Sequence, residues 1–257
     1  MTTYSVSRVD LFGQCPRRYR YRYVERLAPL PTTAEAWVGS LVHEALERLE
    51  HQRARTGEWV EAAVALAWFA REFDRRWEIE HPREIKAGRA AARAIGEICI
   101  ASRYFELVED RLGAASRERV AIELELRFEL GGRPWVGYVD LLTRDRDGSY
   151  YVEDFKTGRR SDPDGSLWWR QLGAYARGVR QLYGEAASQI GLIWHWLQDC
   201  SIARRGYDSA DNARLDAWAR EQIEAIEREE VWPARPSALC RWCEFVDRCP
   251  EGKERAK

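Results

Sequence analysis

Residues 120–157 read VAIELELRFELGGRPWVGYVDLLTRDRDGSYYVEDFKT and decide the fold class of this chain. From residue 120 to residue 130 an apolar side chain recurs at every second position, which is the pattern of a half-buried β-strand. A Gly-Gly turn then leads to a second predicted strand at 135–143, and an Asp-Arg-Asp-Gly turn leads to a third at 150–157. The stretch therefore predicts a three-strand meander.

The segments on either side of this meander predict helices and one further strand. Helical spacing of apolar residues, together with turn residues at the ends, predicts helices in five stretches: 34–53, 58–80, 83–112, 167–183 and 209–230. Residues 189–197 are almost continuously apolar, which favours an interior strand. We therefore expect an α/β fold.

The length of 257 residues, with 45% hydrophobic and 32% charged residues, allows one sizeable core without disulfide staples. We expect a single domain over residues 1–257. Its parts are a mainly helical region (1–113), an α/β core (114–200), and a C-terminal helix with a cysteine cluster (201–257).

The net charge of −1 does not by itself indicate a nucleic-acid partner, but one segment is strongly basic. Between residues 17 and 26 five arginines accompany a single acid, and three tyrosines are interleaved with them. Arginine binds phosphates and aromatic rings stack on bases, so the segment supplies candidate contacts for single-stranded DNA: Arg17, Arg18, Arg20 and Arg22. A helix whose tyrosines pack inward and whose arginines are merely solvated fits the same pattern, and both interpretations stay open.

The amino terminus shows no secretory signal, and no stretch approaches the ~20 apolar residues that a membrane span needs. We therefore expect a cytoplasmic protein without a membrane partner. Thiols stay reduced in that compartment, so six cysteines favour metal binding over disulfides.

Asp140, Asp154 and Lys156 form the first candidate site. Residues two apart on a strand share a face, so Asp154 and Lys156 point the same way. A hairpin closed at residues 145–148 places Asp140 almost opposite Asp154, where both carboxylates can bind one cation. Such an oxygen-rich site suits Mg²⁺ or Mn²⁺, which can activate a water and neutralise charge on a phosphodiester. Lys156 would stabilise the transition-state charge or orient that water.

An isolated Asp-Xaa-Lys is usually solvated surface, so the context of this one matters. Both strands are otherwise apolar, and a trio of charges within them is costly unless the charges are paired or bind a metal. Glu123 faces away from the apolar side of its strand and is a further, weaker candidate ligand. Glu153 lies on the opposite face from Asp154 and is not expected to be a ligand.

Four segments, in order along the chain, resemble the motif series of the PD-(D/E)XK nuclease superfamily, RecB-like branch: 39–43 (GSLVH), 137–140 (GYVD), 152–158 (VEDFKTG) and 171–176 (QLGAYA). Each motif alone is weak, but the ordered series covers roughly residues 5–250. The resemblance implies a restriction-endonuclease-like mixed sheet with an N-terminal helical region.

Carried over by position, the resemblance implies that four groups bind Mg²⁺ or Mn²⁺: His43, Asp140, Asp154 and the backbone carbonyl of Phe155. Lys156 becomes the catalytic lysine, beside the two catalytic aspartates, and Gln171 becomes a residue that positions water or substrate. Tyr175 is a candidate DNA contact, or a core residue. The remaining three histidines, including His195, are expected to be structural.

Residues 240, 243 and 249 form a Cys-xx-Cys pair with a third cysteine six residues on, and Cys15 can supply a fourth sulfur. Four thiolates satisfy either a structural zinc or an iron-sulfur centre, and spacing does not separate the two. The arrangement resembles the iron-sulfur subgroup of RecB-like nucleases, which implies a C-terminal segment whose [4Fe-4S] cluster has four ligands: Cys15, Cys240, Cys243 and Cys249. Cys99 and Cys200 are expected to be buried small hydrophobic residues.

These features predict a metal-dependent deoxyribonuclease, most simply an exonuclease on single-stranded DNA ends in recombination, repair or phage DNA processing. The chain has no Walker phosphate loop, so a helicase partner would be a separate chain, as would a recombinase. An alternative is a CRISPR-adaptation nuclease that trims prespacers beside integrase proteins. An alternative of another class is a non-catalytic DNA-binding scaffold, against which the intact Asp140, Asp154 and Lys156 argue.

Overall fold

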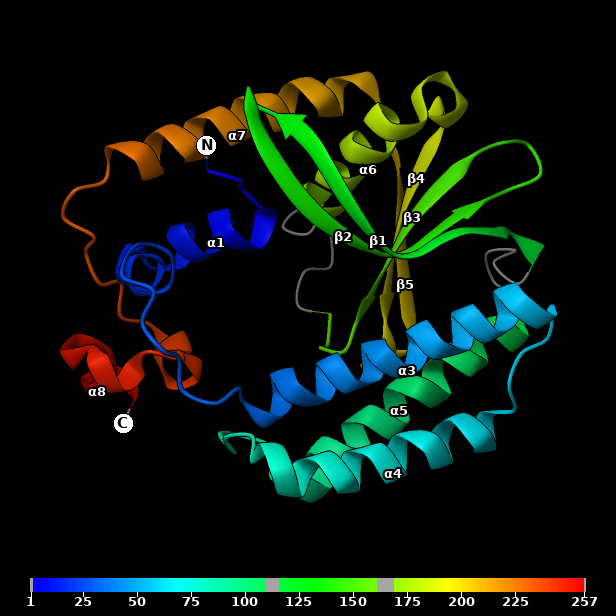
Figure 1. The fold of residues 1–257 in the computed structure, drawn as a ribbon, viewed down its shortest axis with the longest axis horizontal. Helices are drawn as coiled ribbons and strands as arrows, with labels where there is room; N and C mark the ends of the chain where they lie inside the picture. The colour runs from blue at the N-terminus through cyan, green and yellow to red at the C-terminus, as the bar shows by residue number, and fades with distance from the viewer. Residues whose placement is uncertain (1, 110–115, 161–168, 257) are drawn as a thin grey trace.

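The computed structural model of this chain describes residues 2–109, 116–160 and 169–256 (Figure 1). Within them, one sheet has its strands in the order β1-β2-β3-β4-β5. The strands are β1 (Glu118–Leu130), β2 (Arg133–Arg144), β3 (Tyr150–Lys156), β4 (Ile190–Trp196) and β5 (Ser201–Tyr207). Strands β3 and β4 run parallel and the other neighbours antiparallel, so the sheet is mixed.

The helices of the described residues precede and follow the sheet in the sequence, except α6, which connects β3 to β4. They are α1 (Val6–Gln14), α2 (Pro16–Tyr19), α3 (Ala34–Thr56), α4 (Ala62–Glu80), α5 (Arg89–Glu109), α6 (Trp169–Tyr183), α7 (Ser209–Arg228) and α8 (Pro250–Ala256). A π-helical turn (Arg20–Val24) continues α2, and short 3₁₀ turns include Leu197–Asp199 and Ala238–Trp242.

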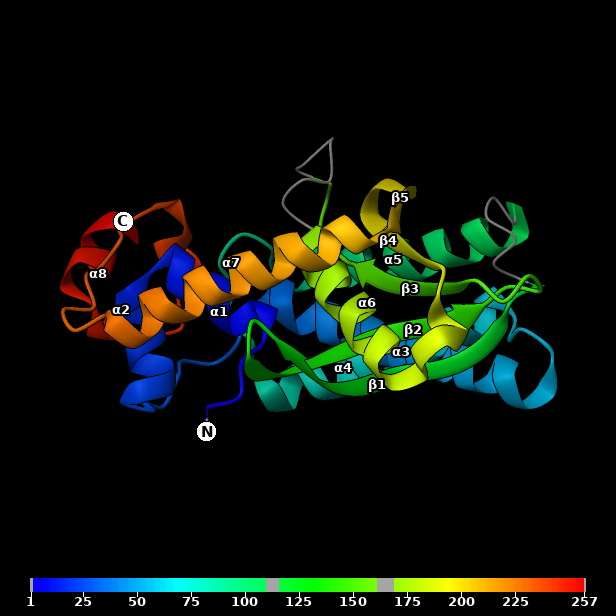
Figure 2. The same ribbon diagram turned by 90° about the horizontal axis from the view of Figure 1, so that it is seen from above.

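The layers are visible in two views. Helices α3, α4 and α5 lie together on one side of the sheet, and α6 and α7 lie on the other (Figure 1). Seen from above, α1, α2 and α8 gather at one end of the molecule, where the carboxyl terminus also lies (Figure 2). Two apolar cores match these layers, since one contains Leu126, Leu172 and Leu215 and the other contains Leu41, Phe73 and Phe155.

Local sequence accounts for the main boundaries. Gly131 and Gly132 both have positive φ, 61° and 75°, which is what a two-residue hairpin turn between β1 and β2 requires. Helix α3 begins after Thr33, whose side chain accepts the backbone N–H of Ala36, and ends at Gly57 in the left-handed conformation.

The predicted meander and interior strand are confirmed by β1 to β4, and the mixed α/β fold agrees with a restriction-endonuclease-like architecture. Strand β5 was missed, because its sequence SIARRGY is polar and it forms a half-exposed edge. The predicted start of the helix at 83–112 was wrong, because α5 begins at Arg89. Arg83 instead forms an isolated β-bridge with Thr33. Residues 110–112 and 167–168 of the predicted helices lie outside the described residues.

None of the helices in the described ranges combines the length and the apolar character that a membrane crossing requires.

Candidate active site

The candidate active site begins where β2 and β3 part. Their hydrogen-bonded pairing ends at Leu141 and Glu153, and the next positions hold Asp140 and Asp154. Here Oδ2 of Asp140 accepts a hydrogen bond from the backbone N–H of Phe155 at 2.7 Å. A side chain thus takes over the bonding between the strands, and the two aspartates lie at opposite positions, as the hairpin geometry predicts.

Glu123 occupies the corresponding position on β1. The β1–β2 register places Glu123 opposite Asp140, and the backbone of Glu123 is left-handed, with φ at 50°. This conformation is uncommon for a residue with a side chain. It changes the alternation of the strand, since Ile122 packs in the core under α3 whereas Leu124 packs in the core under α6. Three carboxylates therefore occupy one row of positions across three strands.

His43 approaches this row from α3. Gly39 lets the helix come close to the end of β3, because a β-carbon at this position would lie 2.9 Å from Oγ1 of Thr157. One turn further, Nδ1 of His43 lies 3.5 Å from Oδ2 of Asp140. Burial alone would lower the pKa of His43, but the hydrogen bond and charge of Asp140 outweigh it and raise that pKa.

His43, Glu123 and Asp140 can hold a metal ion together. Each offers one ligand atom, and these atoms lie within 4.8 Å of one another. Ligands that share a Mg²⁺ at ~2.1 Å lie at most ~4.2 Å apart, so small side-chain rotations suffice. Two carboxylates and an imidazole suit Mn²⁺ as well. Burial and the negative charge of Asp140 raise the pKa of Glu123 to about 7. A bound cation would remove the repulsion between the two carboxylates.

Lys156 connects Asp154 to α6. Its Nζ lies 2.6 Å from Oδ2 of Asp154 and donates to Oε1 of Gln171 at 2.9 Å, and Nε2 of Gln171 in turn donates to the hydroxyl of Tyr175 at 3.1 Å. The ring of Tyr175 covers Gly137, where a β-carbon would lie 2.4 Å from the nearest ring carbon. The glycine of one motif and the tyrosine of another are therefore packing partners.

Asp154 itself is 3% exposed. Burial raises the pKa of Asp154, the charge of Lys156 opposes this, and the charge of Asp140 adds to the rise. Two of the ligands that the resemblance implies, His43 and Asp140, therefore lie close together, and Glu123 joins them. Asp154 is instead paired with Lys156.

A family model described as the PD-(D/E)XK nuclease superfamily matches residues 3–250. The chain belongs to this superfamily. Among solved structures, this PD-(D/E)XK protein is similar to a "Putative exonuclease" from Eubacterium rectale, at 19% identity over 94% of this chain and 86% of that chain, with a TM-score of 0.55. It also matches the crystal structure of SSO0001, at 17% identity over 94% of this chain and 84% of that chain, with a TM-score of 0.38. No curated protein matches.

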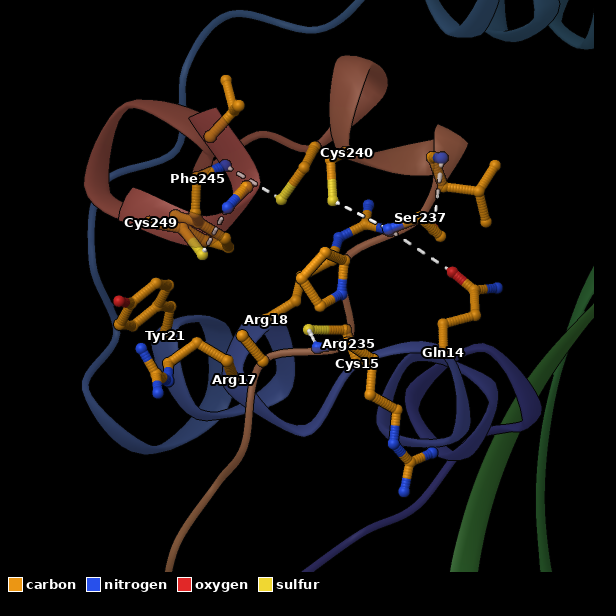
Figure 3. Close-up of a pocket in the computed structure, with 16 residues that line it drawn as sticks. Gln14, Cys15, Arg17, Arg18, Tyr21, Arg235, Ser237, Cys240, Phe245 and Cys249 are labelled. Carbon is orange, nitrogen blue, oxygen red and sulfur yellow. Dashed lines mark hydrogen bonds between the residues drawn. The ribbon is translucent and has the colours of Figure 1, made fainter. Parts of the chain in front are cut away.

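Four of the six cysteines of this PD-(D/E)XK protein, Cys15, Cys240, Cys243 and Cys249, lie together, beside α1, α2 and α8. They line one cavity of about 40 Å³, and Figure 3 shows Cys15, Cys240 and Cys249 around it. Each of the four sulfurs accepts a backbone N–H: Cys15 from Arg235 at 3.5 Å, Cys240 from Ser237 at 3.4 Å, Cys243 from Phe245 at 3.4 Å and Cys249 from Gly252 at 3.3 Å. Burial raises the pKa of Cys243 and of Cys249, and the amide donors oppose this rise. Amide donors of this kind also tune metal–sulfur centres.

Four thiolates around one cavity can hold either a structural zinc or an iron-sulfur centre. Outside this set of four, Cys99 is fully buried as expected, but the expectation for Cys200 was wrong, since Cys200 is half-buried in a turn with φ at 46°.

The basic segment after Cys15 is bound to the carboxyl-terminal region. Four of its five arginines lie next to a carboxylate: Arg17 next to Glu251, Arg18 and Arg22 next to Glu244, and Arg20 next to Glu25. Tyr19 is buried and stacks on Trp232 with ring centroids 5.7 Å apart. The segment thus packs its first tyrosine inward, and DNA contact by its arginines stays a prediction.

Proposed function

We propose that this chain is a deoxyribonuclease that depends on Mg²⁺ or Mn²⁺ and degrades DNA from single-stranded ends. The observation that carries the proposal is the convergence of His43, Glu123 and Asp140 beside the Asp154–Lys156 pair. Membership of a nuclease superfamily supports the reaction class and DNA as the substrate.

A divalent cation at this site would supply charge neutralisation on the scissile phosphate and a water of lowered pKa. His43, Asp140 and Asp154, with the carbonyl of Phe155, are the proposed ligands, and Glu123 joins them here. The ammonium of Lys156 is held by Asp154 and Gln171, so it is oriented to donate a hydrogen bond where negative charge develops on the phosphate. Tyr175 fixes Gln171, and so positions Lys156 through it.

One observation supports action at DNA ends, and a second supports contact with a phosphate backbone. The structural neighbour from Eubacterium rectale bears the name exonuclease. The side chains of Arg20 and Arg22 are 42% and 52% exposed, so their charges remain accessible to a phosphate backbone.

For the cysteines we propose a [4Fe-4S] cluster with a structural role. The four amide-bonded sulfurs, gathered around one cavity, support it. Because the centre would tie Cys15 to residues 240–249, it would fasten the arginine and tyrosine segment to the carboxyl-terminal region, next to the ion pairs of Glu244.

To test this function, purified protein is incubated with single- and double-stranded DNA labelled at either end, in the presence of Mn²⁺ or of a chelator, and the lengths of the labelled products are measured. We expect stepwise shortening of the single strand that requires Mn²⁺. Cutting of closed circular DNA at the same rate would overturn the exonuclease assignment. DNA binding without any Mn²⁺-dependent degradation would instead support a scaffold.

A further inference from the structure

A group of buried ionisable side chains lies behind the candidate active site, on the face of the sheet that α3 and α5 cover. Its members are at most 4% exposed and come from four elements: Glu50 on α3, Arg103 and Glu106 on α5, Glu153 on β3 and His195 on β4. Glu153 lies within the 152–158 motif, next to Asp154, and the other four residues lie outside the motifs that define the nuclease site.

The members bond to one another in a continuous series. Nη2 of Arg103 lies 2.8 Å from Oε1 of Glu50, and its Nη1 lies 3.4 Å from Oε2 of Glu106. The ring nitrogens of His195 then bridge two acids, with Nδ1 2.9 Å from Glu106 and Nε2 2.9 Å from Glu153. The series therefore links α3, α5, β4 and β3.

The charges in this series are compatible with one another. The imidazole of His195 lies between the carboxylates of Glu106 and Glu153. The guanidinium of Arg103 lies between the carboxylates of Glu50 and Glu106, so every buried acid of the series faces a nitrogen group.

Both ends of the series reach elements that carry proposed ligands. Glu50 lies seven residues, two helical turns, after His43 and so faces the same side of α3. Glu153 immediately precedes Asp154. The guanidinium of Arg103 also lies 4.9 Å from the centre of the Phe155 ring. The helix that presents His43 and the strand that presents Asp154 are thus joined through buried charges.

Stability alone does not explain this choice of residues. Buried ion pairs are often matched or exceeded in stability by well-packed apolar residues of similar volume, because desolvation offsets their attraction. What charged, directional contacts supply is a fixed relative placement of the elements that they join.

We propose that the Glu50–Arg103–Glu106–His195–Glu153 network positions α3 against β3, and thereby sets the affinity of the site for its divalent cation. The proposal rests on the proposed function. Residues of this kind act through the ligands and do not touch the reacting atoms. Partners behind metal ligands typically change affinity ten- to a hundredfold when they are altered.

The test uses Arg103→Lys, which keeps the buried charge but loses the planar fork that reaches two acids. His195→Gln is the second variant, so that the test can still be made if one of the two variants fails to fold. Asp211→Asn is the matched control, since Asp211 is also fully buried and ion-paired, with Arg205, yet belongs to α7 and contacts no proposed ligand. Mn²⁺ affinity is measured without DNA, by titration calorimetry and by the electron paramagnetic resonance of free Mn²⁺, together with the melting temperature.

We expect Arg103→Lys and His195→Gln to bind Mn²⁺ about tenfold more weakly or worse, while Asp211→Asn lowers the melting temperature and leaves the affinity unchanged. Network variants that bind Mn²⁺ as tightly as the unmodified protein would overturn the inference and leave the proposed function standing. An equal loss of affinity in Asp211→Asn would overturn it too. Absence of Mn²⁺ binding by the unmodified protein would remove the proposed function itself.

Discussion

The carboxylate of Asp140 accepts the backbone N–H of Phe155 at 2.7 Å, at the position where the pairing of β2 and β3 has just ended. One side chain thus bonds a neighbouring strand and also lies 3.5 Å from His43. Asp140 therefore both bonds the two strands where their pairing ends and contributes to the candidate metal site. Substitution can separate these two roles.

Asp140→Asn keeps an oxygen that can accept the Phe155 N–H but removes the negative charge. We expect this variant to fold normally and to lose at least about 100-fold in DNA cleavage, since a charge at the reacting centre is lost. Asp140→Ala should lose the same activity and also stability, by about 1–3 kcal/mol, because a buried donor is left unsatisfied. Urea unfolding beside a cleavage assay checks both, and an active Asp140→Asn enzyme would exclude Asp140 as a ligand.

Glu123→Gln tests whether the carboxylate on β1 belongs to the metal site. We expect weaker Mn²⁺ binding and slower cleavage, because one of three convergent anionic or imidazole ligands is neutralised. Glu125→Gln is the control, since Glu125 is the next outward-facing glutamate of the strand and bonds to Tyr138. Equal behaviour of the two variants in a Mn²⁺ titration would show that Glu123 is not a ligand.

Gly137→Ala tests the packing that holds Gln171. Its β-carbon would lie 2.4 Å from the ring of Tyr175, so the ring must move or the strand must shift. Overpacking of this kind destabilises by about 1–3 kcal/mol, and we expect cleavage to fall with it because Tyr175 bonds Gln171. In Gly206→Ala, whose β-carbon would meet nothing within 4 Å, chemical unfolding should be almost unchanged. Comparable unfolding of the two variants would contradict the packing account.

Cys243→Ala removes one sulfur of the proposed cluster. We expect loss of iron and of visible absorption, together with lower solubility and lower nuclease activity. Closing a loop between the two chain ends contributes on the order of 5 kcal/mol by analogy with a disulfide. Cys200→Ala, outside the four-cysteine set, should keep its iron. A Cys243→Ala protein that lacks iron but is fully stable would refute the structural role.

Much of the site geometry follows from counting along the sequence. The two-residue turn at Gly131 and Gly132 pairs Leu130 with Arg133. Each residue earlier on β1 then pairs with one residue later on β2, which places Glu123 opposite Asp140. Period-two alternation placed Glu123 on the polar face but made it only a weak candidate ligand. The left-handed backbone at Glu123, which alters the strand there, cannot be read from an alternating pattern.

Other features depend on contacts between distant segments, which periodicity does not encode. The buried partners of His195 come from positions 106 and 153, and the amide donors to the sulfurs come from loops that the cysteine spacing does not specify. His195, expected to be structural, is fully buried, and its place between two acids depends on the packing of α5 on the sheet.

We propose that Lys156 and the acids around it cleave DNA with a divalent cation. The most direct measurement compares the unmodified protein with Lys156→Ala on end-labelled single-stranded DNA, with and without Mn²⁺. We predict Mn²⁺-dependent degradation that falls about 100-fold or more in Lys156→Ala, while the variant still binds Mn²⁺. Undiminished cleavage by Lys156→Ala would contradict this account and place the catalytic centre elsewhere.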